Sequence, residues 1–212
     1  MSQPSAHPSG QSFRSSENRT RVRSLQPNYF EDMYALNIDP WNFETSEYEA
    51  QKYASTIAAL PRDKYRSALE IGGSIGVLTE QLAARCHSLL SIDVSQQAQA
   101  RAKARCEYLP HVQFEVMQVP QRYPSHRFDL TLVSEVGYYW DRQDLVVAQQ
   151  QIAEHLEPTG HLLLVHWTPY VEEYPLTGDE VHESFLTQVG SVYRSLVSKR
   201  EERYRLDLLE RC

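Results

Sequence analysis

The stretch ALEIGGSIGVLTEQLA, residues 68–83, decides the fold because it places a sharp turn between a short apolar run and a helical pattern. Three of the eight glycines in this 212-residue chain fall within positions 72–76. Glycine adopts backbone conformations that other residues avoid, and it lets other groups approach the main chain closely. The stretch therefore predicts a strand at 67–72, a tight turn, and a helix over 77–86.

The remaining sequence continues this alternation of strands and helices. Four further apolar or alternating runs predict strands, at 88–94, 111–119, 128–136 and 161–167. Helical patterns occupy 46–60, 96–109, 145–157 and the segment from Thr177 to 189, with Pro158-Thr159-Gly160 as a turn closing the third of them. The end of the chain divides into two short strands around SKREE (198–202), which predicts an antiparallel hairpin.

Two of these helices begin with a capping box, Ser46 with Glu49 and Thr177 with Glu180. Short strands that alternate with helices are typical of a parallel sheet covered on both faces. We therefore predict a doubly wound α/β fold, with a mostly parallel seven-stranded sheet, helices on both faces and an antiparallel hairpin at the C-terminus. Ligands of such sheets bind at the carboxyl ends of the strands.

The composition indicates which kinds of binding partner and which cellular compartment to expect. The net charge of -7 argues against a nucleic-acid partner, because phosphate binding needs clustered Lys and Arg. No run approaches the ~18 apolar residues of a membrane span, so no membrane partner is expected. The three cysteines, Cys86, Cys106 and Cys212, lack metal-type spacing and favour a reducing, cytoplasmic environment.

The first residues differ in composition from the rest of the chain. Residues 1–27 are rich in Ser and Arg and poor in large apolar side chains, so we expect a disordered leader ahead of one domain at 28–212. The scarcity of acids also suits an organelle transit peptide, although the amphipathic apolar face of such peptides is missing.

The glycine-rich turn fits one class of ligand better than another. A dinucleotide-binding turn reads G-x-G-x-x-G, but Gly72 is followed at those positions by Ser74 and Val77. The residues instead spell Glu70-x-Gly72-x-Ser74-x-Gly76, which resembles the loop of class I S-adenosylmethionine methyltransferases. Bare backbone there would admit the amino-acid end of S-adenosyl-L-methionine. Taken alone, the glycines also fit an ordinary strand-to-helix turn.

Asp93 supplies a second signal, because it ends the second predicted strand. A carboxylate at that place offers two acceptor oxygens to the two hydroxyls of a ribose, and charge-assisted hydrogen bonds of this kind are strong. The alternative for Asp93 alone is a strand-end cap. Together the turn and Asp93 favour S-adenosylmethionine as the cofactor.

Three further segments resemble the nodulation protein S (NodS) family of methyltransferases, and the resemblance extends over residues 28–210. They are DPWNFETSEYEAQKY (39–53), FDLTLVSEVGYYW (128–140) and HWTPYVEEYPLTGDEVH (166–182). The resemblance implies a Rossmann-like fold and methyl transfer from S-adenosylmethionine. The founding activity of the family acts on an amino-sugar nitrogen, which implies a small polar acceptor with an N or O centre.

The residues expected to bind the cofactor lie on the turn, at strand ends and on the N-terminal segment. They are Trp41, Lys52, Glu70, Gly72, Gly73, Ser74, Gly76, Asp93, Val94, Gln118, Val119 and Glu135. Two depart from the family pattern. Gly73 replaces a non-glycine residue and should loosen the turn, and Gln118 stands where an acid commonly holds the adenine amino group, which a glutamine carbonyl can still accept from.

Glu135, His166 and Tyr138 are the catalytic candidates. Methyl transfer is an in-line displacement that depends on alignment, and an amine acceptor must also lose a proton. Glu135 could accept that proton or serve as a buried structural carboxylate. His166, at the end of a strand, is expected at the rim of the cleft as a general base or a satisfied histidine. Tyr138 and Tyr139 could line the methyl site or simply pack in the core.

Other candidates stay open. Trp41, Tyr48 and Lys52 could cover the cofactor, and Lys52 could either pair with the cofactor carboxylate or lie solvated on its helix. Asp179 and His182 could join His166 as metal ligands, but a role of their loop in substrate binding is favoured and no metal is expected. A cofactor-binding module without turnover and a nicotinamide oxidoreductase are the alternative functions. The acceptor is expected to be a small molecule, and the oligomeric state stays open.

Overall fold

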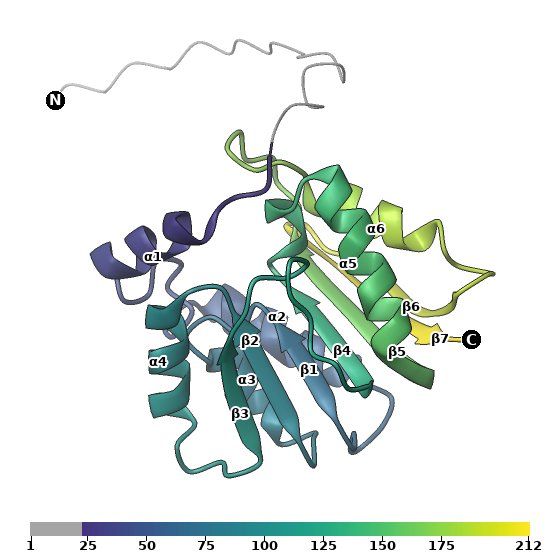
Figure 1. The fold of residues 1–212 in the computed structure, drawn as a ribbon, viewed down its shortest axis with the longest axis horizontal. Helices are drawn as coiled ribbons and strands as arrows, with labels where there is room; N and C mark the ends of the chain where they lie inside the picture. Colours follow the sequence, from purple (N-terminus) through teal and green to yellow (C-terminus); the bar gives the residue numbers. More distant parts are fainter. Residues whose placement is uncertain (1–22) are drawn as a thin grey trace, which may run out of the picture.

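The computed structural model describes residues 23–212, and residues 1–22, which hold most of the predicted leader, lie outside the described residues. Seven strands form one sheet in the order β3-β2-β1-β4-β5-β7-β6 (Figure 1). The strands are β1 (Ala68–Ile71), β2 (Leu89–Asp93), β3 (Val112–Val116), β4 (Phe128–Ser134), β5 (Leu156–Trp167), β6 (Tyr193–Arg200) and β7 (Tyr204–Arg211). The helices are α1 (Pro27–Leu36), α2 (Glu47–Ala58), α3 (Val77–Ala83), α4 (Gln96–Arg105), α5 (Arg142–His155) and α6 (Gly178–Leu186), with a 3-10 turn η2 (Gly137–Tyr139).

The predicted doubly wound fold is confirmed. Strands β1 to β5 pair in parallel, whereas β7 lies antiparallel between β5 and β6 and forms the predicted C-terminal hairpin with β6. The strand order reverses between β1 and β4, because the chain leaves β1 toward β2 and β3 and returns on the other side. Binding sites of such sheets lie at this switch point.

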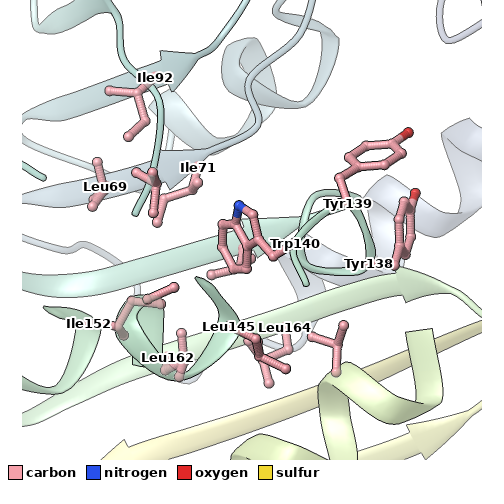
Figure 2. Close-up of a cluster of buried hydrophobic side chains, with 14 of the residues drawn as sticks. Leu69, Ile71, Ile92, Tyr138, Tyr139, Trp140, Leu145, Ile152, Leu162 and Leu164 are labelled. Atoms are coloured by element: carbon pink, nitrogen blue, oxygen red, sulfur yellow. The ribbon is translucent and has the colours of Figure 1, made fainter. Parts of the chain in front are cut away.

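Alternate residues of the central strands feed two separate cores. Leu162 and Leu164 of β5 face a cluster with α5 and α6, while Leu163 and Val165 face a cluster with α2 and α3. Figure 2 shows part of the first cluster, in which Leu145 of α5 approaches the side chains of β5. Because both faces of the strands are buried, their sequences read as nearly continuous apolar runs.

The two predicted capping boxes differ in outcome. Thr177 and Glu180 form the complete reciprocal box at the start of α6. Ser46 accepts a hydrogen bond from the Glu49 backbone at the start of α2, but its own N–H donates to the Asn42 carbonyl. The Glu49 carboxylate instead faces Lys52. The second half of the predicted box is therefore absent, which frees Glu49 for another role.

Several boundaries differ from the predictions. Helix α1 was not expected, because Gln26 supplies no side-chain cap and the helix is held by its buried Phe30 and Tyr34. Helix α5 begins at Arg142 because the Asp141 side chain accepts from two backbone N–H groups there. The segment Pro158-Thr159-Gly160 belongs to β5, where the register with β4 shifts. Apart from β5, every element predicted with residue bounds ends one to four residues earlier than predicted, with the largest difference at α4.

Contacts with the domain begin before the predicted boundary at residue 28. The Ser24 hydroxyl accepts from the Asp141 N–H at 2.9 Å, and the Leu25 N–H donates to the Tyr139 carbonyl at 2.9 Å. Residues 24 and 25 therefore pack beside the loop that follows β4. Within residues 23–212, every helix is too short or too polar to cross a bilayer.

Candidate active site

A cavity of about 420 Å³ lies at the carboxyl ends of β1, β2 and β4. Its volume falls in the range of small-molecule sites. It is covered by α1, by the segment before α2 and by the loop after β5. Most of the residues predicted to bind the cofactor line it, namely Trp41, Lys52, Gly72, Gly73, Ser74, Asp93, Val94, Gln118, Val119 and Glu135.

The glycine turn is held by its backbone. Gly72 has φ +90°, and a Cβ there would lie 2.1 Å from Val136 Cγ2 and 2.7 Å from the Ser134 carbonyl oxygen. The Gly72 and Gly73 N–H groups both donate to the Ile92 carbonyl, at 2.9 and 3.1 Å. A side chain at position 72 would therefore clash with the loop after β4 in a conformation that L residues rarely adopt.

Gly73 does not loosen the turn, which corrects that expectation. A Cβ at this position would lie 2.0 Å from Ser91 Oγ and 3.2 Å from Glu70 Oε2. The Ser91 hydroxyl donates to the same Glu70 oxygen at 2.7 Å. The space of a side chain at position 73 is thus occupied by a hydrogen-bonded serine, so the turn stays closely packed.

Asp93 connects the second strand to the turn. Its Oδ2 accepts from the Ser74 N–H and its Oδ1 from the Ser95 N–H, both at 2.9 Å. Burial raises the pKa of Asp93, and the backbone N–H groups oppose this rise. Each carboxylate oxygen has two lone pairs, so both retain capacity to accept a hydroxyl of a ligand.

Two predicted cofactor contacts are corrected. Glu70 is fully buried behind the turn and does not line the cavity; it accepts from Thr79 Oγ1 at 2.5 Å, and burial raises its pKa to about 7. Gly76 also lies away from the cavity wall. It is the N-cap of α3 at φ +84°, where a Cβ would lie 2.9 Å from Ala102 Cα of α4. Both residues support the turn on the side that faces away from the cavity.

An acidic cluster forms the other end of the cavity. Lys52 is 2% exposed, and its Nζ lies 2.6 Å from Glu135 Oε1 and 2.8 Å from Glu49 Oε2. Burial alone would lower the pKa of Lys52, but the two carboxylates outweigh it and raise this pKa. Lys52 thus pairs with protein carboxylates, which corrects its predicted pairing with the cofactor. Two carboxylates against one ammonium leave the cluster one negative charge.

Glu49 is a site residue that the sequence pattern indicated only as part of a helix cap. It lines the cavity, and burial is the main cause that raises its pKa. The available signal was its spacing of three residues from Lys52, which places both on one face of a helix.

Glu135 owes its position to a strained backbone. It follows β4 with φ +56°, uncommon for a residue with a side chain. Its Oε2 accepts from the Tyr138 hydroxyl at 2.6 Å and from the Trp167 N–H at 2.8 Å. The Tyr138 ring stacks on Tyr174 with centroids 5.0 Å apart. Tyr138 and Tyr139 lie on one side of the loop after β4 and Trp140 on the other (Figure 2), and all three line the cavity.

His166 is not at the rim of the cleft, which corrects its predicted role as a general base. It is fully buried and does not line the cavity. Its Nε2 accepts from the Gly137 N–H at 3.0 Å, and burial lowers its pKa well below the usual range. Both ring nitrogens are engaged, because Nδ1 lies 3.0 Å from His182 Nε2. The imidazole therefore cannot reach an acceptor.

The three residues considered as an alternative metal set do not converge. Asp179 pairs with Arg200 at 2.8 Å, and His182 bonds Asp207 at 2.5 Å. Among the described residues, no group of three or more His, Cys, Asp or Glu is arranged to hold a metal ion.

The cover of the cavity contributes aromatic residues. The Tyr34 hydroxyl of α1 bonds Ser74 Oγ on the glycine turn. Trp41 stacks on Phe43, with ring centroids 5.4 Å apart and an interplanar angle of 25°. Arg101 of α4 donates to the Tyr34 carbonyl at 3.1 Å, which ties α1 to the neighbouring helix. Tyr34 was not predicted, because only the tertiary fold brings α1 to the turn.

Comparison with known proteins identifies the family. The sequence model described as Nodulation protein S (NodS) matches residues 31–167. Nodulation protein S of Bradyrhizobium diazoefficiens is 34% identical over 127 residues, which cover 59% of this chain and 61% of that protein. The corresponding protein of Sinorhizobium fredii is 32% identical, covering 59% of each chain. The chain thus matches about three fifths of the length of these curated relatives.

Solved structures of similar proteins share this fold. A protein of Pseudomonas syringae, provisionally named a methyltransferase, is 36% identical, with a TM-score of 0.69 over 78% of this chain and 100% of that one. The N-methyltransferase NodS from Bradyrhizobium japonicum WM9, in complex with S-adenosyl-L-homocysteine, shares the fold with a TM-score of 0.77 at 22% identity, over 88% and 99% of the chains. Because the family model matches well over half of its residues, the chain belongs to the nodulation protein S family.

Proposed function

We propose that the protein is an S-adenosylmethionine-dependent methyltransferase that acts on the amine nitrogen of a small polar molecule. The observation that carries this proposal is a single cavity with two unlike ends. One end holds the glycine turn and Asp93, and the other holds the net-negative cluster of Glu49, Lys52 and Glu135. A donor at the first end and an acceptor at the second would meet inside one site.

The residues at the first end fit the cofactor. The backbone at Gly72 to Ser74 lies open to the cavity for the amino-acid end, and Asp93 is the acceptor for the ribose hydroxyls. Gln118, beyond β3, can accept from the adenine amino group. S-adenosylmethionine, when bound, supplies an electrophilic methyl group. The family relative from Bradyrhizobium japonicum, an N-methyltransferase in complex with S-adenosyl-L-homocysteine, supports the same assignment.

The charge of the second end favours an amine over a hydroxyl. A protonated amine is attracted to two carboxylates that face one ammonium group, whereas a neutral hydroxyl gains little from that charge. The amine must then lose its proton before it attacks. Glu49 is suited to take it, because burial raises the pKa of its carboxyl. Glu135 orients the site through its bonds with Lys52 and Tyr138.

Two measurements test this proposal. Calorimetry with S-adenosyl-L-homocysteine should give clear binding, and Asp93→Ala should weaken it about 100-fold through loss of charge-assisted hydrogen bonds. A screen with tritium-labelled cofactor should then transfer the label to amino sugars or other amines and not to alcohols or phenols.

Absence of binding would overturn the cofactor assignment. Labelled hydroxyl products would overturn the choice of nitrogen. Tight binding without transfer to any amine, alcohol or phenol would favour a cofactor-binding module without turnover.

A further inference from the structure

Three buried side chains connect the C-terminal strand to the loop after β4. Asp207 of β7 bonds His182 Nδ1 of α6 at 2.5 Å. The other nitrogen of His182 lies 3.0 Å from His166 Nδ1 of β5, and His166 Nε2 accepts from the Gly137 N–H at 3.0 Å. Asp207, His182 and His166 are all 0% exposed. None of the three lines the cavity.

We propose that Asp207 and His182 are positioning residues, which fix the tautomer of His166 and thereby hold the loop at 135–139. This loop carries Glu135 and Tyr138, so the consequence for catalysis rests on the proposed methyltransferase function. The tautomer itself does not depend on that function.

The proton positions follow from one group that can only donate. Because the Gly137 N–H donates, His166 Nε2 must present its lone pair. The proton of the neutral ring then lies on Nδ1 and is donated to His182 Nε2. His182 in turn keeps its proton on Nδ1, toward the Asp207 carboxylate. Every hydrogen bond has one donor and one acceptor only when both rings carry the proton on Nδ1.

The charges around Asp207, His182 and His166 stabilise this arrangement of protons. Burial would raise the pKa of Asp207, but hydrogen bonds, chiefly from His182, and the charge of Arg205 outweigh it and lower this pKa. The Arg205 Nε donates to the same Asp207 oxygen at 2.9 Å. Burial lowers the pKa of both histidines, which keeps the two rings neutral. Asp207 therefore stays an acceptor, and His182 can only donate to it.

The loop at 135–139 depends on the His166 Nε2 acceptor, because three successive residues of β5 form hydrogen bonds with this loop. The Glu135 N–H donates to the Val165 carbonyl at 2.9 Å, and the Trp167 N–H donates to the Glu135 carboxylate at 2.8 Å. His166 supplies the contact between these two, and a Cβ at Gly137 would lie 2.9 Å from its Nε2. The other tautomer of His166 would point an N–H at the Gly137 N–H and push the loop away.

Nitrogen-15 NMR of the full chain with labelled histidine tests the tautomer directly, without any substrate. In the wild type we expect His166 and His182 both protonated on Nδ1, with scalar coupling across the Gly137–His166 and His166–His182 hydrogen bonds. A His166 ring protonated on Nε2 in the wild type would overturn the proposal, whatever the outcome of the activity screen.

Variants of Asp207 separate positioning from general structure. Asp207→Leu should mix the tautomers of His166, whereas Asp207→Asn keeps an acceptor oxygen and should preserve them. Glu210→Leu is the matched control on β7, because Glu210 bonds Arg194 and takes no part in this connection. An unchanged His166 tautomer in folded Asp207→Leu would overturn the proposal.

The kinetic test uses a double-mutant cycle on the amine acceptor found in the screen. Asp207→Leu should lower kcat about 10-fold, the effect of losing one buried hydrogen bond, with affinity for S-adenosyl-L-homocysteine within about 3-fold. His166→Gln presents an amide oxygen to Gly137 that needs no tautomer, so adding Asp207→Leu to it should cost nothing further. Equal losses of kcat in both backgrounds would show a merely structural role.

Discussion

The two ends of the cavity are built in different ways. The cofactor end is built mainly from backbone groups and one carboxylate of two adjoining strand-helix units within residues 70–95, with Gln118 added from beyond β3. The acceptor end combines α2, the loop after β4 and the end of β5, so that Lys52 meets Glu135 across 83 residues of chain. The first end depends on local turn geometry, and the second depends on a buried ion pair that the whole fold assembles. Mutations at the cofactor end should therefore lower cofactor affinity, whereas mutations at the acceptor end should lower kcat.

Gly72→Ala should give the largest effect and confine it to the cofactor end. The added Cβ meets Val136 Cγ2 at 2.1 Å in a backbone at φ +90°. We expect the affinity for S-adenosyl-L-homocysteine to fall more than about 100-fold, and the free energy of unfolding to fall by about 3 kcal/mol. Calorimetry and chemical denaturation measure the two changes.

Gly190→Ala is the matched control, since Gly190 has φ +91° with nothing within 4 Å of the added Cβ. It should cost only about 1 kcal/mol of stability and leave cofactor affinity unchanged. Similar losses in both variants would mean that backbone strain, and not the clash at the turn, controls binding.

Glu135→Gln should damage the acceptor end and spare the other. It removes the charge that faces Lys52 at 2.6 Å. We expect kcat for an amine acceptor to fall about 100-fold, with affinity for S-adenosyl-L-homocysteine within about 3-fold. Asp93→Asn should show the opposite pattern, weaker binding with kcat nearly retained at saturation. Equal loss of cofactor affinity in both variants would erase the distinction between the ends.

Glu70→Gln tests the support behind the cofactor end through pH. Burial raises the pKa of Glu70 to about 7 from an ordinary 4.5. A raised folded-state pKa stabilises the protein fully below the unfolded pKa, and this contribution is lost as pH rises through 7. Between about pH 5 and 8, the free energy of unfolding of the wild type should therefore fall by about 2 to 3 kcal/mol relative to the variant. Parallel pH profiles in urea denaturation would refute this.

Tyr34→Phe should have the smallest effect. It removes only the hydrogen bond between α1 and Ser74 on the glycine turn. Affinity for S-adenosyl-L-homocysteine should fall about 5-fold, the effect of one hydrogen bond, while kcat at saturating cofactor stays the same. Tyr108→Phe is the control and should change neither value, because the hydroxyl of the exposed Tyr108 bonds only the half-buried Glu80 carboxylate. A loss of kcat in Tyr34→Phe would extend the role of α1 to the acceptor end.

The contrast between the two ends of the cavity also explains which features could be predicted from the sequence. The strands, the turn at Gly72 and the position of Asp93 were predictable, because each depends on residues close in sequence. Helix α1 was missed, since the burial of its Phe30 and Tyr34 involves distant residues such as Tyr139 and Ser74. The predictions that Lys52 pairs with the cofactor and that His166 lies at the rim of the cleft were wrong for a related reason. A polar residue on a helix or near a strand end has the same sequence pattern whether its side chain faces a ligand or a second buried residue.

By itself, then, the sequence determined the doubly wound sheet, its C-terminal hairpin and the turn that marks the cofactor end, because periodicity and glycine conformation are local properties. Only the tertiary structure decided that Glu135 joins the helical pair of Glu49 and Lys52, and that His166 turns away from the cavity toward His182. Those outcomes depend on desolvation and on partners from distant segments. Charge and hydrogen-bond pairing inside a protein are properties of the assembled interior and not of any one stretch of chain.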